Sequence, residues 1–170
     1  MNISMHNASV GVYTKLLGNL GALLEKAEAW VGEKKLDPDA ILLARLAPDM
    51  FTFTRQVQIA TDMAKGTCAR LSGQEAPRFE DNETTFPELK ARVAKTLAFL
   101  ESLPVAAFDG AETRKITLKL GPPGKQIERE FVGLAYLQGF GTPNVYFHYS
   151  MVYALLRHNG MALGKPDYVG

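Results

Sequence analysis

The sequence predicts an all-α protein, a four-helix bundle with one small β-hairpin between the third and fourth helices. In four long segments, apolar residues recur every three or four positions, which is typical of helices that bury one face. Between residues 114 and 132 the period changes to two, which indicates a pair of strands. A chain of 170 residues is long enough to build one hydrophobic core, so we expect a single domain over residues 1–170.

The first two long helices follow from their apolar stripes. One stripe runs over residues 10–31 and predicts the first helix. The dipeptide at 37–38, Asp-Pro, offers an N-cap and a first-turn proline, so a short helix follows it. We expect the second long helix to begin at Pro48 and to end at Gly73, which can adopt the left-handed conformation.

The second half of the chain carries clear signals for the ends of its elements. The stretch GQEAPRFEDNETT is polar and has no period, which predicts a crossover between helices that are not antiparallel neighbours. Thr85 and Glu88 have capping-box spacing and start the third helix, which ends near Pro104. The fourth helix is expected from a cap at Thr142 to Gly160, and the tail after it is too short for a further element.

Composition disfavours several classes of function. Lys plus Arg number 19 and Asp plus Glu 18, so no net field attracts nucleic acid or an anionic membrane. No stretch has the roughly 18 apolar residues that span a bilayer, and the start of the chain lacks the pattern of a signal peptide. The turn GPPGK lacks the backbone donors of a phosphate loop. With Cys68 as the single cysteine, we expect a cytoplasmic protein.

His148 is the main candidate for chemistry, because it falls on the apolar face of the fourth helix. A buried imidazole needs hydrogen-bond partners. Asp49 and Gln56 lie on the margin of the apolar face of the second helix and could meet it. Three interpretations stay open: His148 is part of a buried polar cluster, it binds a metal, or it acts as a general base.

Other reactive residues are weaker candidates. His158 lies ten residues after His148, roughly 15 Å along a helix, too far for both to bind one metal ion. His6 precedes the first helix and is a weak third ligand candidate. Cys68 lies on an apolar face, where burial would raise its thiol pKa and make it a poor nucleophile.

Aromatic side chains suggest two kinds of partner. Tyr146, Tyr149 and Tyr153 lie together on the fourth helix and are too apolar to be left in water, which favours a homodimer through this face. A small-molecule binding module is another possibility, with an apolar pocket lined by Phe51, Phe53, Phe147 and Tyr149.

Two long stretches resemble a known family. They are LAPDMFTFTRQVQIATDMAKGTCARLSG and PNVYFHYSMVYALLRHNGMALGKPDYVG. With them the chain resembles an uncharacterised bacterial family, the domain of unknown function DUF1993, within the DinB/YfiT-like superfamily, over nearly its whole length. This resemblance implies a DinB-like four-helix bundle with an up-down-down-up path, often dimeric, which agrees with the predicted crossover.

The resemblance also implies where a metal would lie. In better-understood relatives, which include thiol-dependent transferases and isomerases, one histidine of the second helix and two at i and i+4 on the fourth hold a divalent ion. Here His148 has Val152 at i+4 and Asn144 at i−4, and the second helix has no histidine. Asp49, Gln56 and Asn144 are the residues that would replace ligands.

We therefore expect an uncharacterised DinB-like bundle with a buried polar cluster and no bound cofactor. The alternatives are a metal-dependent transferase or hydrolase that uses zinc, nickel or iron on His148, and a small-molecule binding module.

Overall fold

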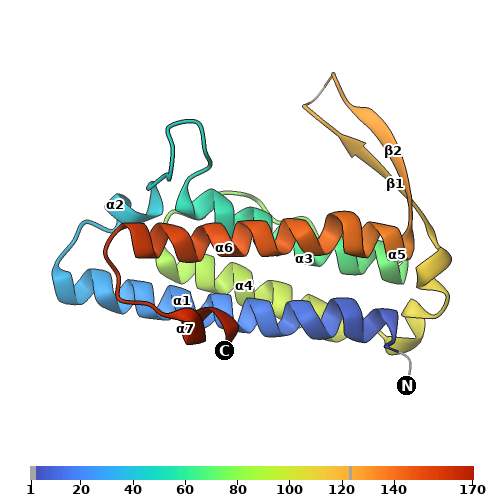
Figure 1. Cartoon of the computed structure of the whole chain (residues 1–170), viewed down its shortest axis with the longest axis horizontal. Helices are drawn as coiled ribbons and strands as arrows, with labels where there is room; N and C mark the ends of the chain where they lie inside the picture. The colour runs from blue at the N-terminus through green and yellow to red at the C-terminus, as the bar shows by residue number, and fades with distance from the viewer. Residues whose placement is uncertain (1–2, 123) are drawn as a thin grey trace.

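The computed structural model describes residues 3–122 and 124–170. It is mostly helical, with a small two-stranded antiparallel sheet. Four long helices lie side by side (Figure 1): α1 (Val12–Lys34), α3 (Phe53–Ser72), α4 (Phe86–Ser102) and α6 (Thr142–His158). α3 packs on both α4 and α6, and α1 packs on α4, whereas α1 and α6 touch much less.

Shorter elements join the long helices. α2 (Asp39–Leu42) precedes α3, and two 3₁₀ turns (Val105–Phe108 and Ala111–Thr113) follow α4. Next come strands β1 (Lys115–Leu120) and β2 (Ile127–Val132) and helix α5 (Gly133–Tyr136). Two π-helical segments, η1 (Asn7–Gly11) and η4 (Leu137–Gly141), lead directly into α1 and α6, and α7 (Lys165–Val169) closes the chain.

The predicted helix ends at Thr85 and Gly73 are confirmed, whereas the predicted helix starts at Pro48 and Thr142 are wrong. Thr85 and Glu88 form the capping box, and Gly73 ends α3 with a φ of 71°. Pro48 does not start α3, because the hydroxyl of Thr52 accepts the N–H of Arg55 and sets the start at Phe53. Thr142 is not an N-cap, because η4 continues into α6 without a break.

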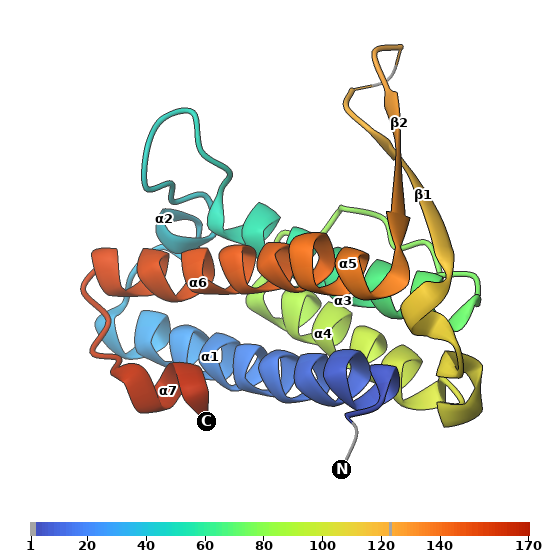
Figure 2. The same cartoon turned by 45° about the vertical axis from the view of Figure 1, so that its right-hand side comes forward.

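The predicted hairpin is confirmed and projects away from the helices (Figure 2). Ile116 and Leu118 are buried, and β1 and β2 pair so that Lys119 lies opposite Glu128. That charged pair is exposed and 3.8 Å apart, so it contributes little to stability.

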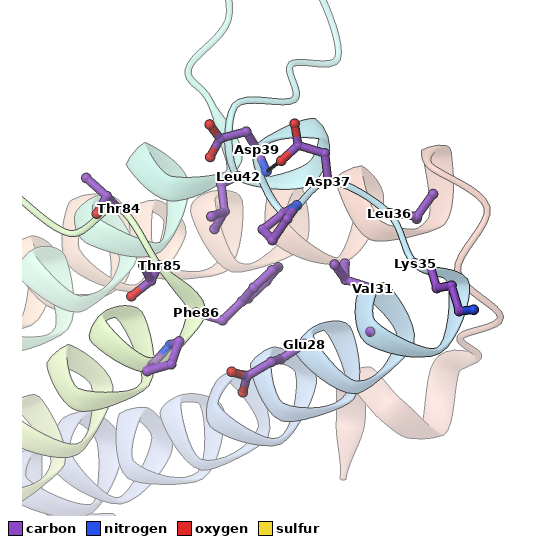
Figure 3. Close-up of a pocket in the computed structure, with 13 residues that line it drawn as sticks. Glu28, Val31, Lys35, Leu36, Asp37, Asp39, Leu42, Thr84, Thr85 and Phe86 are labelled. Carbon is purple, nitrogen blue, oxygen red and sulfur yellow. Dashed lines mark hydrogen bonds between the residues drawn. The ribbon is translucent and has the colours of Figure 1, made fainter.

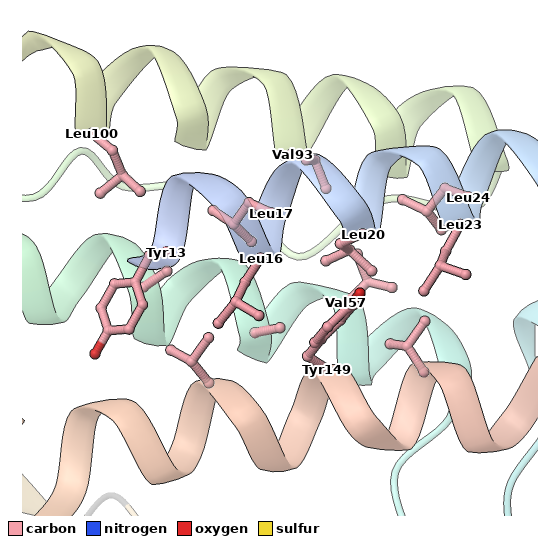
Figure 4. Packing of buried hydrophobic residues seen from close by; sticks show 14 of the residues in the cluster. Tyr13, Leu16, Leu17, Leu20, Leu23, Leu24, Val57, Val93, Leu100 and Tyr149 are labelled. Carbon is pink, nitrogen blue, oxygen red and sulfur yellow. The ribbon is translucent and has the colours of Figure 1, made fainter. Parts of the chain in front are cut away.

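One apolar core runs along the bundle. Figure 4 shows leucines of α1 directed at α3, α4 and α6, with Tyr13 and Tyr149 among them. Both tyrosines are at most 1% exposed. Within the described residues, no helix is long and apolar enough to cross a bilayer.

The tail differs from the prediction, because it forms helix α7 and packs on α1 and α6 of its own chain. The ring of Tyr168 stacks on Tyr149 with centroids 4.4 Å apart and meets the edge of Tyr153. Asn19 donates to the carbonyl of Tyr168 at 3.1 Å. The tail therefore covers most of the aromatic face that suggested a dimer.

Candidate functional site

The structure brings His148 of α6 and Gln56 of α3 together. His148 Nδ1 lies 2.7 Å from Gln56 Oε1, so the imidazole donates its Nδ1–H to the amide oxygen. The amide nitrogen of Gln56 donates in turn to the carbonyl of Phe51 at 3.5 Å. Gln56 is 1% exposed and His148 7% exposed, so the pair lies at the edge of the core.

His148 is neutral at pH 7. Burial lowers its pKa to about 4, and the charge of Arg55 lowers it further in the same direction. A base with so low a pKa removes protons poorly near neutral pH. The environment of His148 therefore suits a hydrogen-bond donor within the core better than a general base.

The other predicted site residues do not join this pair. Asp49 lies in the exposed loop before α3, because that helix begins four residues after it. Asn144 donates to the carbonyl of Phe140 at 2.7 Å, one turn back along its own helix. His6 packs edge-on against Phe108, next to η1, whereas Gln56 lies in the first turn of α3 near α2 at the other end of the bundle (Figure 1).

The donor set around His148 does not fit a transition metal. Over residues 3–122 and 124–170, no three His, Cys, Asp or Glu side chains come together in a metal-binding group. The nearest donor, Gln56, offers an amide oxygen, which is a weak ligand for zinc.

The four predicted pocket aromatics do not line one cavity. Phe53 and Tyr149 are at most 1% exposed and belong to the core. Phe51 and Phe147 are each 52% exposed and lie on the surface, where Phe147 meets the edge of the His148 ring. Phe51 precedes α3, so it does not share the helical period that buries Phe53.

A network of charges joins α3, α4 and the crossover, residues 73–85. Its centre is Arg92 of α4, which is 2% exposed. Its Nε donates to Thr61 at 2.8 Å, and its Nη1 to Glu83 and to the carbonyl of Glu80, each at 3.0 Å. We call this set the charge network: Arg55, Asp62, Lys65, Asp81, Glu83 and Arg92.

The charge network is balanced. Arg92 Nη2 lies 2.9 Å from Asp62 and 3.0 Å from Asp81, off the direction of its N–H bonds, so the attraction there is ionic. Arg55 binds Asp81, and Lys65 lies 3.0 Å from Asp62 with its ammonium over the ring of Phe79. Three cations meet three carboxylates, so the network has no charge left for a ligand.

A groove lies between α1 and α6 near the hairpin. We call it the α1–α6 groove, a cavity of about 640 Å³ whose walls include Ala8, Val12, Leu134, Leu137 and Tyr146. Thr142 also lines it, and its hydroxyl bonds to the phenol of Tyr13 at 3.0 Å. Burial raises the pKa of Tyr13, so this phenol stays neutral. The groove thus has apolar walls and one lining hydroxyl, that of Thr142, which is held by the buried Tyr13 behind it.

Polar contacts continue from the lining into the core. Tyr136 receives a hydrogen bond from Arg70 at 3.2 Å and lies 3.4 Å from the hydroxyl of Thr67. A Cβ on Gly141 would lie 2.7 Å from Thr67, so only glycine lets η4 approach α3 this closely. Close packing therefore fixes the polar lining of the groove.

A family model described as a domain of unknown function, DUF1993, matches residues 5–169. The chain belongs to the DUF1993 family. It is also similar to a solved structure, a DinB family member protein from Shewanella denitrificans, with 42% identity and a TM-score of 0.85. The match covers 98% of this chain and 92% of that chain. No curated protein matches.

A second cavity of the DUF1993 protein, of about 560 Å³, lies under α2 (Figure 3). Phe86 and Val31 form its apolar part, and Glu28, Asp37 and Asp39 lie around it. Its polar groups serve the fold: Glu28 binds Lys90 at 2.6 Å, and Asp37 accepts the N–H of Asp39. Part of its polar lining is therefore committed to the fold.

Cys68 of the DUF1993 protein is buried, and burial raises its thiol pKa to about 12. The thiol is therefore protonated and unreactive at neutral pH. The predicted inert character of Cys68 agrees with this environment.

Sequence reasoning missed both Arg92 and the groove of the DUF1993 protein. Arg92 lies three positions after Leu89 and four before Thr96, on the buried side of α4, and the acidic run of the crossover was the available signal for its partners. The groove could not be predicted from a local sequence pattern, because its size depends on the distance between two packed helices.

Proposed function

We propose that this DUF1993 protein is a small-molecule binding module whose ligand occupies the α1–α6 groove. The observation that carries the proposal is a cavity of about 640 Å³ with apolar walls and the hydroxyl of Thr142 in its lining, fixed by a hydrogen bond to the buried Tyr13. Ligand sites commonly have this size and combine apolar walls with a few placed polar groups.

The competing metal-dependent transferase has less support. Its candidate ligand, His148, already donates to Gln56, and the predicted ligands Asp49 and Asn144 lie apart from it. A binding role needs no such cluster.

The directions of the four long helices are also part of the proposal. We infer that the four long helices follow the up-down-down-up path of DinB-like bundles. The crossover supports this, because its residues Phe79 to Glu83 contact α3 on the way back from the end of that helix to the start of α4. A cytoplasmic location and a homodimer complete the proposal.

The test is an NMR titration of the ¹⁵N-labelled protein with the neutral probes indole and 1-octanol. Amide shifts should concentrate at Ala8, Val12 and Leu137, which line the groove. The blocking variant is Gly11→Phe, since a Cβ at Gly11 meets nothing within 4 Å and Gly11 lines the continuation of the groove. It should abolish the shifts.

The matched control is Gly18→Phe, because Gly18 lies on the same helix, is equally open, and lines neither cavity along this seam. It should titrate like the parent. Shifts that centre on His148, or that leave out Ala8, Val12 and Leu137, would place the ligand elsewhere.

A further inference from the structure

We propose that the ligand of the α1–α6 groove is an elongated amphipathic carboxylate, an acyl or aryl acid whose anionic head lies at Lys15. This inference rests on the proposed function and adds the chemical class of the ligand. Three independent features of the groove carry it.

The first feature is its elongated form. A further cavity of about 410 Å³ continues the groove toward α7, and the two share Asn7, Val12 and Tyr146 as walls. One end is apolar, at Ile3 and Leu134, and the other lies beside Tyr168 and Lys15. A long, narrow ligand fits this continuous space.

The second feature is the charge along the groove. Lys15 is the charged side chain among the described walls of these two cavities, and no Asp or Glu of those walls opposes it. Lys26, on the same helix, pairs with Asp167, whereas Lys15 has no carboxylate partner in residues 3–122 and 124–170. An anionic head near Lys15 therefore meets attraction without competition from the protein.

Asn7 adds hydrogen-bond donors to the groove. It lines both cavities, and its side chain has one long contact, 3.5 Å from its Oδ1 to the ring of His6. Its amide N–H groups are therefore available to a ligand in the same cavity that Lys15 lines. Lys15 supplies the charge for a carboxylate head, and Asn7 can donate to a polar group further along the ligand.

The third feature is the local backbone on both walls. Asn7 and Ala8 belong to the π-helical segment η1, and Leu137 and Gln138 belong to the π-helical segment η4. Such segments are rare and are frequent at functional sites, because a π turn widens the helix and redirects its side chains. Here two of them face each other across one groove.

The experiment uses 11-(dansylamino)undecanoic acid as the probe and follows its fluorescence on titration with the full chain. We expect saturable binding that weakens as salt rises, because the head contact is partly exposed. Lys15→Glu should weaken binding by about tenfold, since repulsion replaces attraction. Lys34→Glu, at the exposed end of α1, is the charge-matched control and should bind like the parent.

A second probe distinguishes the contribution of the carboxylate head from that of the apolar groove. The neutral alcohol analogue of the same chain should bind the parent and Lys15→Glu equally. If acid and alcohol bind alike and Gly11→Phe removes both, the groove stands and the carboxylate inference is overturned. If the acid does not bind, or binds equally to Gly11→Phe, the inference is also wrong, whereas indole and octanol test the groove separately.

Discussion

Two seams on opposite sides of the bundle are covered by segments of different chemistry. The crossover covers the α3–α4 seam with ion pairs around Arg92, and every charge of that network has a partner. The tail covers the α1–α6 seam with the stacked rings of Tyr168 and Tyr149, and beyond them the seam opens into a groove beside Lys15. The charges on the first seam are committed to each other, whereas Lys15 beside the second seam has no carboxylate partner among the described residues.

The largest expected effect comes from removing the central cation of the charge network on the α3–α4 seam. Arg92→Met leaves Asp62, Asp81 and Glu83 close together without their shared cation. We expect a loss of about 3 to 5 kcal/mol in the free energy of unfolding, the usual cost of removing one partner from a buried ion pair. Urea denaturation followed by circular dichroism measures it.

Lys119→Met is the control for Arg92→Met, because it removes a cation from an exposed pair on the hairpin. It should change the free energy by less than about 0.5 kcal/mol. A similar small loss in Arg92→Met would mean that the crossover is held by its apolar contacts alone.

The next largest effect is expected from removing the aromatic stack that covers the α1–α6 seam. Tyr168→Ala removes the stack on Tyr149 and the bond to the hydroxyl of Ser150. We expect a loss of about 2 to 3 kcal/mol in the same denaturation experiment. Val169→Ala, at a residue 45% exposed, is the control and should unfold like the parent. Equal stability of both variants would show that α7 covers the seam without stabilising it.

A smaller effect on the free energy of unfolding is expected from the hydrogen-bonded pair of His148 and Gln56. His148→Leu strands the oxygen of Gln56 and should cost roughly 1 to 2 kcal/mol, whereas the double variant with Gln56→Leu should cost less than the single one. Denaturation of His148→Leu, Gln56→Leu and the double variant measures this coupling. If the losses of the two single variants add up in the double variant, the hydrogen bond does not stabilise the fold.

His148 also makes the stability of the folded protein depend on pH. His148 has a folded pKa of about 4, below its ordinary value of 6.5. The unfolded chain therefore takes up a proton at this residue as pH falls from 6.5 to 4, while the folded protein does not, and stability falls across that window. His148→Leu should lack this part of the pH dependence.

The smallest effect on stability is expected from Phe147→Asp. Phe147 is half exposed on α6, outside both covered seams, so it is the stronger candidate for a homodimer contact than the buried Tyr149. Light scattering should report a lower mass for Phe147→Asp with unchanged unfolding. Val105→Asp, at an exposed residue after α4, is the control and should keep the parent's mass. An unchanged mass in Phe147→Asp would exclude this surface.

Local signals predicted most elements of this fold, and the misplaced start of α3 came from a choice between two neighbouring local signals. The capping box at Thr85 and the alternation in β1 act over a few residues, and both appear as predicted. Pro48 looked like a helix start, but Thr52 supplied the better cap. These features depend on neighbours along the chain.

The candidate site was harder to predict. Gln56 was correctly placed opposite His148 because both follow the period of their helices. The charge network was not predicted, because the crossover folds over the polar side of α3 and covers Gln58 and Lys65 there. A helical wheel describes one helix and carries no information about a segment that folds over it.

The tail has a consequence for the speed of folding. The hydrogen bond from Asn19 to Tyr168 joins residues 149 positions apart. Contacts between such distant residues form slowly, because a large part of the chain must be ordered before they are made. We therefore expect α7 to dock late in folding and to open first, so its amides should exchange with solvent faster than those of α1.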